Sequence, residues 1–181
     1  PSPNEVVFTR NATHSINQVA HGLTWEKGDV VLTTDREHNS NLVPWLQLEQ
    51  EQGIDHRVVP SHPDNTFDME AFEAACAEAG KNLKMVAMSH VGNLDGIEIP
   101  IAKVTKVARD HDALVAIDGA QSTPHMNVDV QALDIDFLSF SIHKMCGPSG
   151  MGGLWGRYEL LDDLRTIQSG GQTVKTSSYT N

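Results

Sequence analysis

The sequence is poor in cysteine, aromatic residues and positive charge, and it contains no long hydrophobic run. Its 181 residues include two cysteines, Cys76 and Cys146, too few for a disulfide framework or a zinc-type ligand pair. Lysine and arginine number 13 against 24 aspartates and glutamates, which gives a net charge of -11. Binding of a nucleic-acid backbone requires clustered Lys and Arg, so we expect no nucleic-acid partner. The nine histidines are scattered without zinc-ligand spacing, and we expect no metal site.

No apolar stretch approaches the roughly 20 residues of a membrane span, and no basic region followed by an apolar run opens the chain. We therefore expect no membrane association and a cytoplasmic setting. The length fits one domain with a sizeable core. The chain does not begin with Met, and the polar stretch 169–181, predicted to be loop, ends without a closing element. Both features suggest an excerpt of a longer protein, although removal of Met before Pro1 explains the start equally well.

Short apolar segments alternate along the chain with longer amphipathic segments. The apolar segments, such as 113–117, are continuous rather than alternating, which is typical of a parallel sheet covered on both faces. The predicted strands span 6–9, 30–34, 57–60, 85–89, 114–118, 137–141 and 153–156. The predicted helices span 13–23, 40–52, 69–79, 101–110 and 158–165. The predicted fold class is α/β, with a mostly parallel seven-stranded sheet flanked by helices.

Helix-end signals support these boundaries. Asp68 and Ser40 precede or open predicted helices as candidate N-terminal caps. Gly53 and Gly80 stand where helix C-termini belong, and Pro100 suits the first turn of its helix.

Polar side chains follow four of the predicted strands at the point where each strand ends. These residues are His38, Asn93, Asp118 and Lys144. Ligands of open α/β sheets sit beyond the carboxyl ends of the strands, so we expect the four side chains to converge there. Each residue alone has an ordinary explanation as a loop, turn, cap or surface residue. The prediction of a ligand-binding site therefore rests on the convergence of all four residues.

A lysine just past a strand end suits a Schiff base to a phosphorylated aldehyde. Lys144 has this place, beside the hydroxyl of Ser141 and the imidazole of His143. Asp118 could keep the nitrogen of a pyridine ring protonated by pairing with it, and Gln121 could donate to the ring's phenolic oxygen. Together these groups predict pyridoxal 5′-phosphate (PLP), the electron sink of amino-acid chemistry.

A phosphate group needs hydrogen-bond donors, and the segment 11–13 opens a predicted helix. The free backbone N–H groups at Ala12 and Thr13, the helix dipole and the Thr13 hydroxyl would bind an anion, and Ser141 and His143 would complete the cup. His38 could stack on the cofactor ring and move protons on the substrate. Asn93 could contact both cofactor and substrate.

The chain also resembles the class V aminotransferase superfamily of PLP fold-type I enzymes, most closely the group II cysteine desulfurases and selenocysteine lyase-like enzymes. The matching segments run in order over nearly the whole chain, and they are 8–13 with 16–17, 37–45, 89–93, 118–122, 124–126, 128–130, 136–138, 140–141, 143–148 and 170–171. Three positions depart from the usual family pattern. Ile142 replaces a glycine, Asn39 replaces a second histidine, and Gly92 replaces a serine.

The resemblance implies a role for each matching position. Lys144 would bind the cofactor aldehyde and later take the α-proton of the substrate, while His38 would stack on the ring and carry protons near the substrate sulfur. The remaining cofactor-binding positions are Asp118 for the ring nitrogen, Gln121 for the phenolic oxygen, Ala12, Thr13, Ser141 and His143 for the phosphate, and Asn93 near the substrate carboxylate.

The resemblance further implies a homodimeric enzyme that converts L-cysteine to L-alanine and an enzyme-bound persulfide, with a sulfur-acceptor protein in iron–sulfur cluster assembly. The family's persulfide cysteine and its carboxylate-binding arginine lie in a C-terminal portion with no counterpart in this chain. Cys76 and Cys146 are therefore expected to be packing residues. Residues 1–181 are expected to form the PLP-binding large domain, without the N-terminal segment and the C-terminal small domain.

Three alternatives remain at this point. The first is another class V PLP enzyme acting on an amino acid, which could be an epimerase, a lyase or an aminotransferase. The second is a cofactor-free α/β domain that serves as a scaffold. The third, a doubly wound nucleotide-binding domain, is weaker because no Gly-x-Gly-x-x-Gly follows an early strand.

Overall fold

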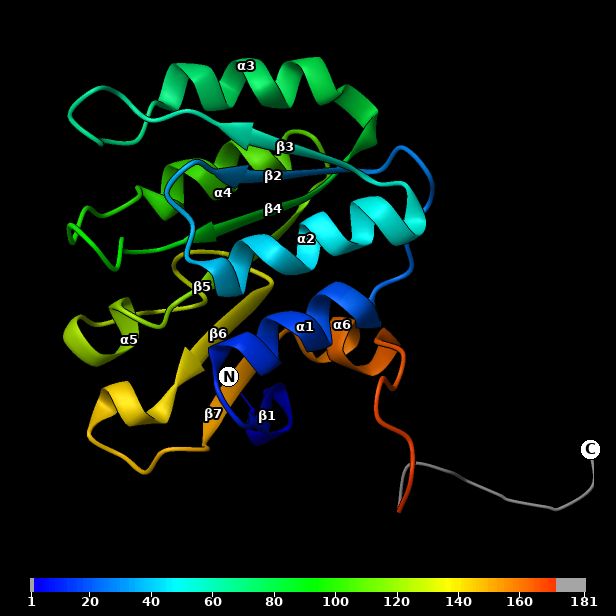
Figure 1. The fold of residues 1–181 in the computed structure, drawn as a ribbon, viewed down its shortest axis with the longest axis vertical. Helices are drawn as coiled ribbons and strands as arrows, with labels where there is room; N and C mark the ends of the chain where they lie inside the picture. Colours follow the sequence, from blue (N-terminus) through cyan, green and yellow to red (C-terminus); the bar gives the residue numbers. More distant parts are fainter. Residues whose placement is uncertain (1, 172–181) are drawn as a thin grey trace, which may run out of the picture.

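The computed structural model describes residues 2–171 and contains one seven-stranded sheet of order β1-β7-β6-β5-β4-β2-β3 (Figure 1). The neighbours from β6 to β3 in this order are parallel, whereas β7 is antiparallel to both β6 and β1. The predicted α/β class with a mostly parallel sheet is confirmed. The strands are β1 Val6–Thr9, β2 Val30–Thr34, β3 Asp55–Val59, β4 Leu83–Ser89, β5 Leu114–Asp118, β6 Phe137–Ser141 and β7 Gly152–Gly156.

Helices cover both faces of the sheet, α3 and α4 on one and α1, α2 and α6 on the other (Figure 1). Successive residues of β4 serve the two cores in turn: Val86 packs with α3 and α4, whereas Met85 and Ala87 pack with α1 and α2. This is why the central strands are apolar throughout. The α-helices are α1 Ala12–Gly22, α2 Asn39–Gln52, α3 Met69–Ala79, α4 Ile101–Arg109, α5 Ser122–His125 and α6 Tyr158–Asp163, and the 3₁₀ turns are η1 Pro3–Glu5, η2 Gly80–Asn82 and η3 Ile142–Met145.

The predicted elements all exist, and their ends differ by up to two residues. The strand predicted at 57–60 starts at Asp55 because parallel pairing with β2 brings Asp55 opposite Val30. The cap prediction for Asp68 is confirmed, since its side chain accepts from the Ala71 N–H at 2.9 Å. Gly53 ends α2 in the left-handed region, at φ 74°.

The prediction of Ser40 as a helix cap is wrong. Helix α2 begins at Asn39, and the N-terminal cap is His38, whose Nδ1 accepts from the Ser40 N–H at 3.1 Å. An imidazole can fill this position because an unprotonated ring nitrogen accepts a backbone hydrogen bond as a hydroxyl or carboxylate would. Pro100 likewise precedes α4 instead of lying in its first turn.

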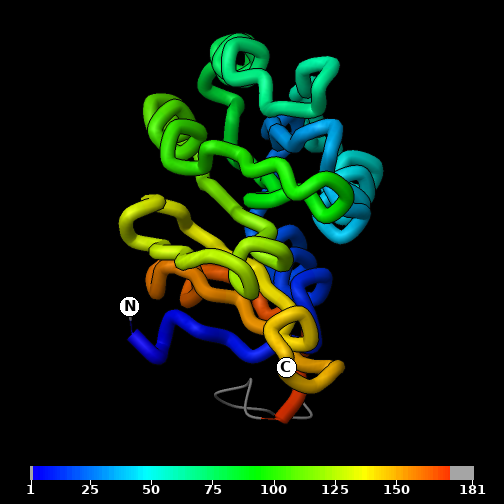
Figure 2. The backbone as a smooth tube through the Cα atoms, turned by 90° about the vertical axis from the view of Figure 1, so that its left-hand side faces the viewer, coloured from blue at the N-terminus to red at the C-terminus, as the bar shows by residue number. Residues whose placement is uncertain are grey.

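Figure 2 views the molecule from the side on which the parallel strands end, where the loops after β2, β4, β5 and β6 gather. None of the helices within residues 2–171 has the length and apolar character needed to cross a membrane. Residues 169–171 lie in neither helix nor strand, and the remainder of the loop predicted at 169–181 falls outside the described residues.

Cys76 is a packing residue of α3, as predicted, whereas the same prediction is wrong for Cys146, which is exposed at the end of η3. Its side chain has no exposed surface and lies in the core beside Phe72. Burial, and to a smaller extent the neighbouring Glu73 carboxylate, raises the pKa of the Cys76 thiol to about 12. The thiol therefore stays protonated at physiological pH, and the reactive thiolate is scarce.

We predict that a maleimide reagent at pH 7.5 modifies Cys146 but not Cys76 in the folded protein, because Cys146 is exposed and Cys76 is enclosed. Peptide mapping by mass spectrometry checks this. Cys76 should react after unfolding in denaturant, which serves as the control. Equal labelling of both cysteines in the folded protein would contradict the core packing of α3.

Candidate active site

The start of helix α1 lies directly against strand β7. Asn11 caps the helix by accepting from the His14 N–H at 2.8 Å. Ser15 donates to the Gly153 carbonyl at 2.9 Å, which ties the first turn to the strand. Gly152 makes the close approach possible, because a Cβ at this position would lie 2.5 Å from the Cα of Asn11. The helix N-terminus is thereby fixed at the sheet edge where β6 ends.

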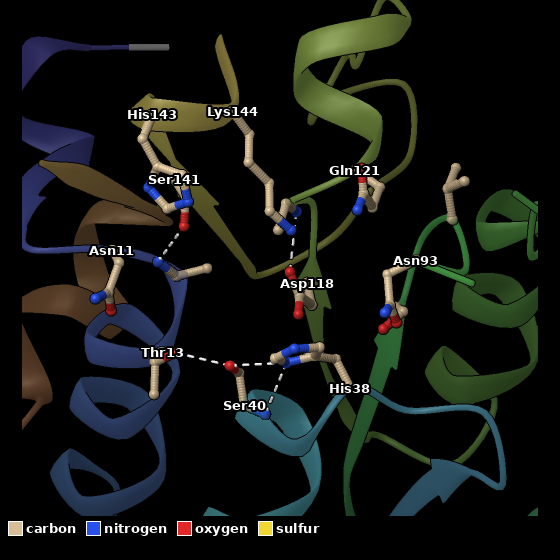
Figure 3. A pocket seen from close by; sticks show the side chains of 14 residues that line it. Asn11, Thr13, His38, Ser40, Asn93, Asp118, Gln121, Ser141, His143 and Lys144 are labelled. Atoms are coloured by element: carbon tan, nitrogen blue, oxygen red, sulfur yellow. Dashed lines mark hydrogen bonds between the residues drawn. The ribbon is translucent and has the colours of Figure 1, made fainter. Parts of the chain in front are cut away.

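A cavity of about 220 Å³ opens at this edge, and all nine predicted site residues line it (Figure 3). They come from the first turn of α1, from η3 and from the ends of β2, β4, β5 and β6 or the segments that follow them. The convergence predicted from the strand ends is therefore observed. The residues are Ala12, Thr13, His38, Asn93, Asp118, Gln121, Ser141, His143 and Lys144.

One corner of the cavity has the character of an anion site. The Ala12 N–H, at the start of α1, donates to the Ser141 hydroxyl at 2.9 Å, so it is not free, contrary to the prediction from the sequence. The Ser141 hydroxyl accepts in this bond and keeps its own proton to donate. The Thr13 hydroxyl lies beside them, and His143 follows in η3. The positive end of the helix dipole, together with hydroxyl and imidazole donors, would stabilise a phosphate group.

Asp118 ends β5 and supplies a buried carboxylate to the cavity. It is 6% exposed and accepts from the Ala120 N–H at 2.9 Å. Burial raises the pKa of Asp118, and this effect is opposed by the Ala120 hydrogen bond and then by the charges of Lys144 and protonated His38. Figure 3 shows the Lys144 side chain directed toward this carboxylate. A buried carboxylate with little hydrogen bonding is suited to pair with a cation.

Glu37 is a second buried carboxylate, and the sequence interpretation missed it. The residue as a whole is half-buried, but its carboxyl group is enclosed by donors from three elements. The hydroxyls of Thr34 and Ser89 and the amide of Asn41 each donate to it at 2.7 Å, and the Ser89 N–H donates at 3.0 Å. Burial raises the pKa of Glu37, and these hydrogen bonds oppose the rise. Glu37 thus joins the ends of β2 and β4 and fixes the position of its neighbour His38.

The loop after β4 carries Asn93 and is held by an ion pair. Arg36, from the loop after β2, pairs with Asp95 and donates to the Asn65 side chain at 2.9 Å. Asp95 also accepts from the Ile97 N–H at 3.1 Å. A Cβ at Gly92 would lie 2.3 Å from the carboxylate oxygen of Asp95. The departure from serine at Gly92 therefore makes room for this carboxylate.

The other two departures leave the predicted donors in place. Ile142 packs over Gly147, where an added Cβ would meet the Ile142 methyl carbon Cγ2 at 2.2 Å. Ser141 still meets the start of α1, so Ile142 does not open the phosphate corner. Asn39 is the exposed first residue of α2.

Asn11 and Ser40 also line the cavity and were not among the predicted site residues. Both were interpreted only as helix-start residues, and their positions next to predicted site residues were the available signal. Among residues 2–171, no group of three or more His, Cys, Asp or Glu side chains is arranged to hold a metal ion.

Chemically, the donor set fits a phosphorylated pyridine aldehyde. A lysine amine, a buried carboxylate and the N-terminus of a helix surround a single cavity, and their chemistry suits the aldehyde, the ring nitrogen and the phosphate of PLP. The assignment of each residue to a group of the cofactor stays a prediction.

Comparisons with known proteins agree with this reading of the cavity. A family model described as aminotransferase class-V matches residues 1–181. A probable cysteine desulfurase of Streptomyces coelicolor is 40% identical over 98% of the chain, and a cysteine desulfurase of Salmonella newport is 40% identical over 99%. The chain spans 44% of the length of each relative.

Solved structures show the same fold. The cysteine desulfurase CsdA of Escherichia coli superposes with a TM-score of 0.92 at 33% identity, over 99% of this chain and 45% of that one. The cystine C–S lyase C-DES, in complex with its product cysteine persulfide, gives 0.87 at 28% identity, over 98% of this chain and 48% of that one. A C-DES variant with glycine covalently linked to its PLP cofactor gives 0.85 at 29% identity, over 93% and 45%.

We predict that Gly152→Ala destabilises the protein by about 1–3 kcal/mol, because the new methyl group meets backbone atoms of Asn11 and must displace the start of α1. Urea unfolding of the full-length protein measures the change. Gly171→Ala is the matched control, since nothing lies within 4 Å of the added Cβ, and it should be close to neutral. Equal effects of the two substitutions would argue against close packing of α1 on β7.

We predict that Asp118→Asn raises the melting temperature of the cofactor-free protein at pH 7 by about 2 °C or more. The pKa of Asp118 is higher in the folded protein than in the unfolded chain. As pH rises between these two pKa values, ionisation of Asp118 therefore lowers the stability of the folded protein. Asparagine keeps the acceptor for the Ala120 N–H and removes the charge.

The rise in melting temperature caused by Asp118→Asn should therefore vanish below about pH 4, where the Asp118 carboxyl is protonated in the unfolded chain as well. Calorimetry at several pH values checks this. A gain that is independent of pH, or a loss at pH 7, would contradict the proposed cost of burying this charge.

Proposed function

The chain belongs to the class-V aminotransferase family, and we propose that the protein carrying it is a PLP-dependent cysteine desulfurase. It would convert L-cysteine to L-alanine and an enzyme-bound persulfide sulfur. The observation that carries this proposal is the single cavity that combines Lys144, Asp118 and the anion-binding start of α1. The desulfurases among the relatives and structural neighbours support the choice of reaction.

When bound, PLP supplies an electron sink for negative charge at the substrate α-carbon. Lys144 would bind the aldehyde carbon and afterwards hold the proton taken from that α-carbon. Asp118 would keep the ring nitrogen protonated, and the opposite charges would stabilise each other in the buried site. Gln121 would donate to the phenolic oxygen.

The other residues would bind and orient. Ala12, Thr13, Ser141 and His143 would hold the phosphate. Asn93 would orient the substrate carboxylate from the loop after β4. His38 would stack on the ring and hold or release a proton near the substrate sulfur.

We further propose that residues 1–181 form the PLP-binding large domain of a longer protein, since the chain spans 44% of its curated relatives. A persulfide-bearing thiol from outside Cys76 and Cys146 would accept the sulfur, because Cys76 is enclosed and Cys146 caps the turn η3. A homodimer, a sulfur-acceptor protein, a cytoplasmic setting and a role in iron–sulfur cluster assembly stay predictions from the family resemblance.

A second candidate reaction is a C–S lyase of the same family. The structural neighbour C-DES, a cystine C–S lyase, favours this alternative. The two reactions differ in the organic product, because β-elimination releases pyruvate whereas desulfuration leaves alanine. An epimerase or aminotransferase would release no sulfur, and a cofactor-free scaffold would leave the nine converging side chains without a ligand.

We predict that the full-length protein, incubated with PLP, L-cysteine and a reductant, forms alanine and sulfide in equal amounts. Lys144→Ala should lower the rate by at least about 10²-fold because the proton-holding amine is lost. Cys146→Gly is the control and should leave the rate unchanged, since Cys146 has the left-handed φ of 61° that glycine adopts without strain.

Alanine, pyruvate and sulfide quantified together check the prediction. Formation of pyruvate in place of alanine would contradict the proposed desulfurase and indicate a C–S lyase. Sulfur release that survives Lys144→Ala would remove the assignment of Lys144.

A further inference from the structure

A chain of hydrogen bonds joins the anion-binding start of α1 to the imidazole of His38. The Thr13 and Ser40 hydroxyl oxygens lie 2.7 Å apart, and the Ser40 oxygen lies 2.9 Å from His38 Nδ1. The Ser40 N–H donates to the same nitrogen at 3.1 Å. Figure 3 shows this chain running from α1 to the loop before α2, along one wall of the cavity.

The direction of each hydrogen bond follows from the backbone donor. An amide N–H can only donate, so His38 Nδ1 must carry a lone pair, and the neutral imidazole must carry its proton on Nε2. With Nδ1 unprotonated, the Ser40 hydroxyl donates to it. The Thr13 hydroxyl then donates to the Ser40 oxygen.

The side chain of Ser40 does not serve as a helix cap. A capping hydroxyl accepts from an N–H two or three residues further on, whereas the Ser40 hydroxyl contacts Thr13 and His38 instead. No residue of the described chain bonds to His38 Nε2, and the imidazole lines the cavity together with Asp118 and Lys144. The Nε2 proton is thereby available to a bound molecule.

We propose that Ser40 is a positioning residue that fixes His38 as the Nε2–H tautomer and couples it to the anion site at Thr13. In this state neutral His38 donates a hydrogen bond from Nε2 to a ligand atom in the cavity. When the Thr13 hydroxyl donates its hydrogen bond to a phosphate group instead of to Ser40, the Ser40 hydroxyl rotates and donates to the Thr13 oxygen. His38 Nδ1 then keeps only the backbone donor, and the tautomer preference weakens.

The coupling to phosphate rests on the proposed function, whereas the tautomer in the free protein does not. The first test therefore uses the cofactor-free full-length protein with ¹⁵N-labelled histidine rings. The His38 signals are identified by their loss in His38→Gln. We expect an acceptor-type Nδ1 and a protonated Nε2 in the wild-type protein.

Ser40→Ala removes the hydroxyl but keeps the backbone donor. The ratio of the Nε2–H to the Nδ1–H tautomer should fall about fivefold, the factor that corresponds to one hydrogen bond of about 1 kcal/mol. Ser40→Thr keeps a hydroxyl and should restore the ratio. An unchanged ratio in Ser40→Ala, or a protonated Nδ1 in the wild-type protein, would overturn the assignment.

The second test adds inorganic phosphate and follows its binding by ³¹P NMR. In the wild-type protein, the His38 signals should shift toward those of Ser40→Ala. In Thr13→Val, which lacks the hydroxyl, they should stay unchanged. Phosphate that binds without moving the His38 signals would overturn the coupling.

Phosphate that does not bind would overturn both the coupling and the phosphate corner of the proposed function. In that case the tautomer found in the free protein still decides the role of Ser40. The two failures are thus distinguishable.

Discussion

The parallel pairing of β4, β5 and β6 is the constraint on which the candidate site depends. Ser89 pairs with Asp118, the last residues of β4 and β5, and Asp118 pairs with Ser139, two residues before β6 ends. The three strands therefore end close together. Parallel strands place all their carboxyl ends at one edge, and the residues just beyond them must share the same space. The antiparallel strand β7 places the N-terminus of α1 at the same edge, because Gly152 lets the start of the helix pack closely against the strand.

The two buried carboxylates at the site, Glu37 and Asp118, differ in how far the fold compensates their negative charge. Glu37 is surrounded by hydroxyl, amide and backbone donors, so its charge is compensated within the fold. Asp118 has one backbone donor, and its main nearby positive charge is that of Lys144. A carboxylate left partly uncompensated costs stability in the free protein, and a cationic ligand group would recover that cost. This contrast supports the proposal that Asp118 binds a ligand and that Glu37 positions its neighbour His38.

Much of the fold and of the cavity lining could be predicted from sequence because the signals are local. Continuous apolar runs mark the buried strands, and the polar residues directly after them mark the cavity. The capping role of His38 could not be predicted, because it depends on the tautomer and orientation of one imidazole. The contact of Thr13 with Ser40 joins residues 27 positions apart in the chain. Such contacts depend on how α1 and α2 pack, which no local pattern specifies.

The departures from the family pattern illustrate the same limit. Gly92 and Ile142 directly precede the predicted site residues Asn93 and His143, but neither removes a side chain that the cofactor requires. In the structure, Gly92 accommodates the Asp95 carboxylate that binds Arg36, and Ile142 fills the space beside Gly147. Each substitution is thus matched by a neighbouring side chain, and Ser141 lies in hydrogen-bond contact with the start of α1. An unusual residue within a functional motif therefore reflects, in the first place, the side chains packed against it. It changes the chemistry of the site only where those side chains displace a group that contacts the ligand.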